Sequence, residues 1–333
     1  MDRPAPQQDL ATLPPISVSV VVPVYQGEQT LTALTEEIAR FVEEQSTPAG
    51  ARFRVSELVL VHDAGPDDSE RVMQELAARF PWVRPLWLSR NFGQHAATLA
   101  GLASSIGEWV FTMDEDGMHP PAAIPTFLDV ALRENTSLVY ARPTNAKRHG
   151  PFRDLTSNFA KWSFGALLGD RSLGTFSSFR LIDGETARSL AAFCGQGVYL
   201  DVALAWVVSS SAFCDVELKT DTRASGYAFG TLLRHFWRLV MSSGTRPLRF
   251  ITFAGVSALV IAIVISVYAA YRKVSGGVPV EGWTSMIVAL SGFSGLILFS
   301  LGIIAEYLGT TLMMAMGRPL YLLVSRPSRR RRR

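Results

Sequence analysis

Residues 109–121 of this 333-residue chain read W-V-F-T-M-D-E-D-G-M-H-P-P, a short apolar run followed at once by acidic residues. The apolar run predicts a buried strand over 109–112, with the acids at its carboxyl end. In open α/β sheets the ligand crevice lies outside the carboxyl ends of the strands. The oxygens of Asp114 and Asp116 suit Mg²⁺ or Mn²⁺ and leave coordination positions for the phosphates of a nucleotide. The pair therefore predicts a metal-diphosphate site, although an ordinary solvated acidic turn has the same local pattern.

Strands and helices are expected to alternate on both sides of this stretch. Runs of β-branched and apolar residues predict further strands over 16–24, 57–61, 83–88 and 138–141. Apolar residues at helical spacing predict helices over 28–44, 68–80, 94–106 and 121–133. This order predicts an α/β fold with a mostly parallel, Rossmann-like sheet that helices cover on both faces.

The C-terminal third has a different composition. Residues 250–271 and 282–305 carry no charge, in a chain that is 48% hydrophobic and 18% charged. Each stretch is long enough to cross a hydrocarbon core of about 30 Å as a helix. The connection between them is short, so we expect a transmembrane hairpin. Basic residues are concentrated outside the hairpin loop, which predicts that both ends are cytoplasmic.

The position of these basic residues determines how the net charge of +3 is interpreted. They lie beside the predicted membrane spans, where anionic lipid headgroups attract them, so we expect membrane lipids and no nucleic acid as partners. Residues 229–247 predict an amphipathic juxtamembrane helix, with an ordinary core helix as the alternative. Cys194 and Cys214 suit a reducing compartment, and their spacing predicts neither a disulfide framework nor a zinc site. Residues 1–15 have no signal-peptide pattern and are expected to be disordered.

Two other predicted strands end in residues that suit a ligand. Pro23 and Tyr25 close the strand 16–24 and could pack against a base or ribose, and Glu28 would start the next helix. Asp63 follows the strand 57–61 and could accept a hydrogen bond from a base N–H, while Asp68 would cap the following helix. Each residue alone also suits an ordinary turn. Together with residues 114–116 they place acids at three strand ends on one edge of the sheet.

Six segments in this order resemble a known family. They read V-V-V-P-V-Y (20–25), V-H-D-A-G-P-D-D-S (61–69), R-N-F-G-Q-H (90–95), M-D-E-D-G-M-H-P-P (113–121), S-S-F-R-L (177–181) and A-E-Y-L-G (305–309). The chain resembles membrane-bound family 2 glycosyltransferases of the GT-A fold over about residues 17–321. Within that family it is similar to the polyprenyl-phosphate glycosyltransferases, which include dolichol-phosphate mannose synthase, bactoprenol glucosyltransferase and undecaprenyl-phosphate aminoarabinose transferase.

The resemblance implies roles for individual residues. Asp63 would bind the nucleobase, and Asp114 and Asp116 would hold Mg²⁺ or Mn²⁺ and the sugar diphosphate. The full set expected at the nucleotide sugar is Pro23, Tyr25, Glu28, Asp63, Arg90, Gln94 and Asp114. The set expected at the lipid phosphate is Arg142, Arg153, Ser157, Arg180 and Arg223, with Arg153 and Ser157 four apart on one helix face. The expected catalytic residues are Asp116, Arg142, Arg153 and Ser157.

The implied reaction is inverting transfer of a hexose-like sugar from a nucleotide-diphosphate sugar to undecaprenyl or dolichyl phosphate. The chain departs from the family pattern at four places. An acid is usual where His62 and Ser178 stand, and D-L-Q-D/N is frequent in place of residues 116–119. A longer R-x-x-G-E-S-K-Y segment is usual where this chain has only the R-A-S-G of 223–226. These departures leave the sugar open. They also leave a catalytically inactive membrane scaffold as the alternative. A nucleotidyltransferase on the same sheet is a weaker alternative, because it has no need of a membrane hairpin.

The expected organisation follows from these observations. The N-terminus 1–15 precedes a GT-A domain over 16–228, the juxtamembrane helix 229–247, transmembrane helices over 248–272 and 282–308, and a basic cytoplasmic tail over 309–333. We expect an integral protein of a bacterial inner membrane with its catalytic domain in the cytoplasm. The resemblance further implies a homo-oligomer, often a tetramer, and a separate flippase as partner, because two helices are too few to move the product across the membrane.

Overall fold

The computed structural model describes residues 14–145, 177–195, 199–219 and 282–325, together with short helical pieces between 255 and 271. The predicted helix 229–247, most of the predicted span 248–272 and the arginine-rich end of the tail lie outside these residues, as does most of the predicted disordered N-terminus.

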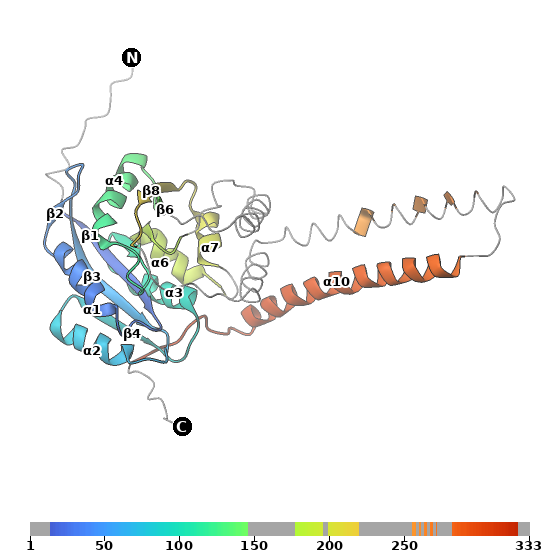
Figure 1. The fold of residues 1–333 in the computed structure, drawn as a ribbon, viewed down its shortest axis with the longest axis horizontal. Coiled ribbons are helices and arrows are strands. Elements are labelled where there is room, and N and C mark those ends of the chain that lie inside the picture. The colour runs from blue at the N-terminus through green and yellow to red at the C-terminus, as the bar shows by residue number, and fades with distance from the viewer. Residues whose placement is uncertain are drawn as a thin grey trace, which may run out of the picture.

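A nine-stranded mixed sheet forms the centre of the domain, in the order β8-β6-β7-β5-β1-β3-β4-β9, with β2 paired to β3 (Figure 1). The strands are β1 (Ile16–Val24), β2 (Gln45–Ser46), β3 (Arg52–His62), β4 (Val83–Leu88), β5 (Trp109–Thr112), β6 (Leu138–Pro143), β7 (Arg180–Asp183), β8 (Ala212–Val216) and β9 (Leu323–Val324). The predicted strands 16–24, 83–88 and 109–112 are confirmed residue for residue. The predicted strand 57–61 is the second half of the longer β3.

Parallel pairing is limited to the run β5-β1-β3-β4 and to the pair β6-β8. Strand β7 lies antiparallel between β5 and β6, and β9 lies antiparallel beside β4. The expectation of a mostly parallel sheet is therefore confirmed, with β2, β7 and β9 as the antiparallel strands among the described residues. The antiparallel strands β7 and β9 are short, and the sequence alone did not predict them.

Helices cover both faces of the sheet, as predicted (Figure 1). One buried cluster joins a face of the sheet to α1 (Leu31–Ile38), α2 (Ser69–Arg79) and α4 (Ile124–Glu134). A second cluster joins the other face to α3 (Gln94–Ser104), α6 (Gly184–Phe193) and α7 (Leu200–Val207). Alternation along β1 explains the two layers, because Val20 and Val22 belong to the first cluster and Val21 to the second.

Helix α10 (Trp283–Ala315) extends away from this domain (Figure 1). Its 33 residues span about 50 Å at 1.5 Å per residue. Among the described residues it is the one helix long and apolar enough to cross a membrane, over Gly292–Ala315. The helix continues for about two turns past residue 308, where the predicted span ends, before the chain returns to the sheet.

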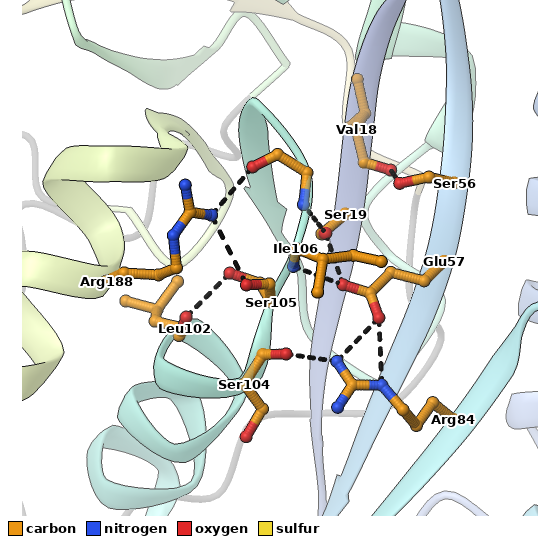
Figure 2. Close-up of polar contacts among 11 residues, drawn as sticks. Val18, Ser19, Ser56, Glu57, Arg84, Leu102, Ser104, Ser105, Ile106 and Arg188 are labelled. Carbon is orange, nitrogen blue, oxygen red and sulfur yellow. Dashed lines mark hydrogen bonds and ion pairs between the residues drawn. The ribbon is translucent and has the colours of Figure 1, made fainter.

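A buried carboxylate braces the amino edge of the sheet (Figure 2). Glu57 is 5% exposed, and its Oε1 accepts hydrogen bonds from Ser19 Oγ at 2.6 Å and the Ile106 N–H at 2.8 Å. Its Oε2 accepts from the Nε and Nη2 of Arg84 at 3.0 and 2.7 Å. The Gly107 N–H donates to Ser19 Oγ at 2.8 Å. The network ties the turn between α3 and β5 to β1, β3 and β4.

Candidate active site

The carboxyl ends of the central strands meet at the opposite edge of the sheet. Because β1, β3, β4 and β5 are parallel, the residues after them lie along this one edge: Tyr25, Asp63, Ser89 and Met113. Strand β6 runs the same way as β5, since both are antiparallel to β7, so β6 also ends here and β7 begins here. The expectation that residues 63 and 114–116 share one edge is confirmed.

Asp114 is oriented by groups from three separate segments. Its Oδ1 accepts a hydrogen bond from Gln94 Nε2 at 2.6 Å, at the first residue of α3. Its Oδ2 accepts from Ser178 Oγ at 2.7 Å, two residues before β7. Its backbone N–H donates to Nδ1 of His119 at 2.9 Å. The carboxylate remains 27% exposed, so it is held firmly at a surface that a ligand can reach.

His119 is the member of the site that the sequence did not assign. The residue is 7% exposed and its ring stacks on Phe179, with centroids 4.5 Å apart and planes 10° apart. Since Nδ1 accepts from Asp114, the neutral ring carries its proton on Nε2. Burial lowers the pKa of His119, and the nearby Asp114 and Asp116 partly offset that effect. The ring is therefore a neutral brace beneath the acidic loop.

The side chains of Glu115 and Asp116, which follow Asp114, face in different directions. Glu115 turns inward, where its Oε2 and Oε1 accept from the Tyr25 and Gln26 N–H groups, each at 2.9 Å, and burial raises its pKa. Asp116 is exposed, and its Oδ1 accepts from the Met118 N–H at 2.9 Å in an Asx turn. Gly117 has φ +76°, a conformation that favours glycine. Glu115 thus anchors the loop to β1 while Asp116 faces solvent.

The donor set fits a hard divalent cation only in part. Asp114 and Asp116 offer carboxylate oxygens at one accessible loop, which suits Mg²⁺ or Mn²⁺ completed by phosphate and water. Within the described residues there is no cluster of three or more His, Cys, Asp or Glu side chains that could hold a metal by itself. Such a site would need the ligand's own oxygens to complete it, as is usual when Mg²⁺ is bound together with a nucleotide.

Asp63 holds the loop that leads into α3. Its carboxylate is 3% exposed and accepts from the Phe92 N–H at 2.7 Å and the Gly93 N–H at 2.8 Å. Burial raises its pKa, and these two hydrogen bonds oppose that shift. Its own N–H donates to the Val24 carbonyl at 2.8 Å, which ties β3 to β1. The expected contact with a nucleobase remains a prediction, because the observed role of this carboxylate is to fix the loop.

Three other residues were expected to contact the nucleotide, and the structure places each in a different environment. Pro23 is buried within β1 opposite Val61, so its expected stacking on a base is wrong. Tyr25 is 42% exposed at the site edge and remains available. Glu28 does not start a helix, since α1 begins at Leu31; its Oε2 instead accepts from the Asp68 N–H at 3.2 Å. Asp68 is at the N-cap of α2 as predicted, but its side chain makes no capping bond.

Arg90 is exposed, and its guanidinium lies over the ring of Phe92, 4.8 Å from the centroid. Whether it contacts a nucleotide sugar remains a prediction. The position next to the loop that Asp63 fixes is compatible with that role.

The residues expected at the lipid phosphate divide into three groups. Arg142, near the end of β6, forms a two-pronged ion pair with Asp215 on β8 at 2.5 and 2.8 Å, which raises the pKa of Arg142 and lowers that of Asp215. Arg180 is 2% exposed and ion-paired with Asp201. Its expected role at a lipid phosphate is therefore wrong, because the guanidinium is buried between the sheet and α7. Arg153, Ser157 and Arg223 lie outside the described residues.

The braced acidic loop lies at the carboxyl edge of the parallel strands, where open α/β sheets bind their ligands. The model of the family "Glycosyl transferase family 2" matches residues 19–191, which run from within β1 to within α6. The chain belongs to this family and is a glycosyltransferase.

Curated relatives match over most of the chain. The bactoprenol glucosyl transferase of Shigella phage SfX is 25% identical over 315 residues, covering 93% of this chain and 100% of the relative. The putative glycosyltransferase CsbB of Bacillus subtilis is 29% identical over 271 residues, covering 80% of this chain and 81% of the relative. Both matches extend well beyond the family domain.

A solved structure agrees with the fold. Glucosyl-3-phosphoglycerate synthase from Mycobacterium tuberculosis, in complex with Mn²⁺ and uridine-diphosphate-glucose, superimposes with a TM-score of 0.50 at 19% identity, covering 69% of this chain and 79% of the other. At this identity the likeness concerns the fold alone. The GT-A type of α/β fold expected from the sequence is confirmed.

Proposed function

We infer that the protein transfers a sugar from a nucleotide-diphosphate sugar to a polyprenyl phosphate, with inversion, at the cytoplasmic face of a membrane. The observation that carries this proposal is the position of Asp114, braced by Gln94, Ser178 and His119 beside the exposed Asp116. A relative named as a bactoprenol glucosyl transferase aligns over 93% of the chain, which supports a lipid-linked acceptor. The long apolar helix α10 supports a membrane location.

The chain's own residues account for the donor side of the reaction. Asp114 and Asp116 would hold Mg²⁺ or Mn²⁺, which when bound supplies positive charge to the leaving diphosphate. Gln94, Ser178 and His119 keep Asp114 in one orientation, so little reorganisation is needed when the donor binds. Tyr25 offers an exposed ring at the same edge for the base or ribose.

Ser178 has a specific place in this proposal. The resemblance to the family implies an acid at this position, whereas the Ser178 hydroxyl here donates to Asp114 Oδ2 at 2.7 Å. A carboxylate in its place would repel Asp114 at short range. A phosphate acceptor is already anionic near neutral pH, so the reaction does not require a general base at this residue. Arg142, once released from Asp215, would set the acceptor phosphate in line.

The membrane arrangement is also part of the proposal. The catalytic domain and both termini would be cytoplasmic, in the inner membrane of a bacterium, with membrane lipids around a hairpin formed by α10 and the predicted span 248–272. A homo-oligomer, proposed as a tetramer, and a separate flippase for the product complete the expected partners.

The test is a product assay on the full chain in lipid nanodiscs. A panel of UDP- and GDP-sugars is offered with Mn²⁺ or Mg²⁺ and with undecaprenyl phosphate, and undecaprenol, which lacks the phosphate, is the control acceptor. The proposal expects lipid-linked sugar with undecaprenyl phosphate only, and an anomeric configuration opposite to that of the donor. Protein that is folded and binds nucleotide but gives no product with any donor would instead favour an inactive scaffold.

A further inference from the structure

The chain turns sharply after α10 and returns to the sheet. Gly317 has φ +64°, its N–H donates to the Met314 carbonyl at 3.0 Å, and the Arg318 N–H donates to the Met313 carbonyl at 3.3 Å. This is a glycine-terminated helix end. From Ala315 to Leu322 the chain can span at most about 25 Å, so the end of α10 is tethered close to the edge of the sheet that carries the site.

After that turn, β9 extends the sheet beyond β4. Leu323 lies opposite Leu88 and Val324 opposite Trp87, in antiparallel register. Leu320 and Tyr321 pack on the buried cluster between the sheet and α3, α6 and α7, and Val324 packs on the cluster of the other face. The segment 320–324 therefore packs against both layers of the catalytic domain.

The hydrogen bonds of β9 continue into the candidate site. The Ser89 N–H donates to the Leu322 carbonyl at 2.9 Å. Ser89 is followed directly by the segment 90–93, whose Phe92 and Gly93 N–H groups are held by Asp63. Gly93 is the N-cap of α3. The segment 89–93 is thus fixed by β9 at its first residue and by Asp63 at its last two.

The same segment leads to the acidic loop. Gln94, the first residue of α3, donates to Asp114 Oδ1 at 2.6 Å. Phe92 packs on the same buried cluster as Leu320 and Tyr321. A shift of residues 89–93 would therefore move the group that orients Asp114 as well as the loop that Asp63 holds.

We propose that residues 320–324 are a positioning element of the nucleotide-sugar site, which they hold in its binding geometry through the segment 89–93. This inference rests on the proposed function in that it names part of the donor site. It differs from the simpler role of covering an exposed sheet edge. An edge cover would affect stability alone, whereas a positioning element also changes donor affinity when the fold is intact.

Two prolines in the full chain separate these roles. Because the Leu322 carbonyl faces β4 and backbone direction alternates along a strand, the N–H of Val324 also faces β4 and that of Leu323 faces away. Val324→Pro removes a donor on the paired side, and Leu323→Pro is the matched control. Nucleotide affinity is measured by calorimetry with UDP and with GDP in the presence of Mn²⁺.

The proposal expects Val324→Pro to weaken binding of the nucleotide at least tenfold, and Leu323→Pro to change it less than threefold. Hydrogen exchange at the Phe92 and Gly93 amides should become faster in Val324→Pro only. Wild-type affinity in Val324→Pro with a lowered melting temperature would overturn the proposal in favour of an edge cover. Equal losses in both variants would also overturn it, because the paired side would then have no special effect.

A pair of truncations provides a second test that holds even where a proline variant fails to fold. One chain ends at Ser325 and the other at Pro319, so both lack the arginine-rich end and differ only by residues 320–325. Only the shorter chain should lose affinity, and equal affinities would overturn the proposal. If the wild-type chain binds neither nucleotide, the proposed function fails and the donor-site role falls with it, while exchange at Phe92 and Gly93 in the two proline variants still shows whether residues 320–324 hold the segment 89–93.

Discussion

Replacing His119 tests whether the brace beneath the acidic loop matters for catalysis. His119→Phe keeps an aromatic ring against Phe179 but leaves the Asp114 N–H without the acceptor that lies at 2.9 Å. An unsatisfied, partly buried donor costs about 1–3 kcal/mol. In a domain of about 200 residues this lowers the melting temperature by roughly 2–12 °C. His119→Asn restores an acceptor oxygen near the position of Nδ1 and should recover most of the loss.

The catalytic consequence is separable from the stability loss. If the Asp114 carboxylate moves, transition-state stabilisation falls, and a loss of about 1.4–2.7 kcal/mol corresponds to a 10- to 100-fold lower kcat/KM. We expect this range for His119→Phe, measured by transfer of labelled sugar in nanodiscs well below the melting temperature, and less than a fivefold loss for His119→Asn. A His119→Phe enzyme with wild-type kcat/KM, or an Asn variant as impaired as Phe, would refute the reasoning.

Three further predictions concern other parts of the molecule. Arg142→Ala should raise the KM for polyprenyl phosphate about tenfold or more without changing the KM for the donor; Arg133→Ala, an exposed arginine on α4, is the control, and an equal effect on both substrates would contradict the assignment. Glu57→Ala should lower the free energy of unfolding by about 2–4 kcal/mol, because it leaves buried donors unsatisfied and removes the carboxylate partner of Arg84, while nucleotide affinity stays within twofold; a selective loss of affinity would be inconsistent with a purely structural network. Burial lowers the pKa of His119 below its usual 6.5, so its contribution to stability is full above about pH 6.5 and is lost as the pH falls toward the folded-state pKa; unfolding free energies from pH 7.5 to 5 should fall more steeply for wild type than for His119→Phe, and parallel curves would exclude this linkage.

The fold was predictable where the sequence pattern is strong and local. Six of the nine residues in strand 16–24 are valine or isoleucine, and such a run has few alternatives to a buried central strand. Strand β7 was not predictable because its first residue is a charged arginine. Arg180 is neutralised by Asp201, 21 residues further along the chain, and nothing local to residues 180–183 reveals that partner. Because this partner cannot be recognised from the sequence, Arg180 was predicted to be a ligand for phosphate.

The sequence predicts where in the fold the candidate site lies, but it does not predict which side chains orient Asp114. An apolar run ending in D-x-D locates Asp114 and Asp116 at a strand end, which the structure confirms. The groups that orient Asp114 could not be found in this way, since Ser178 lies 64 residues from it in sequence and Gln94 lies 20 residues away. His119 had a local signal, five residues after Asp114. Only the backbone turn at Gly117 shows that its ring folds back to the Asp114 N–H.

The most direct test of the central claim is a titration of transfer rate against Mn²⁺ for wild type and Asp116→Asn, with Asp68→Asn as control. Asp68 is an exposed carboxylate at the start of α2 that pairs with Arg71. If Asp114 and Asp116 hold the metal and diphosphate, Asp116→Asn lowers the maximal rate at least 100-fold and shifts the Mn²⁺ dependence to higher concentration, while Asp68→Asn matches wild type. Transfer by Asp116→Asn at the wild-type rate and with wild-type Mn²⁺ dependence would contradict the account.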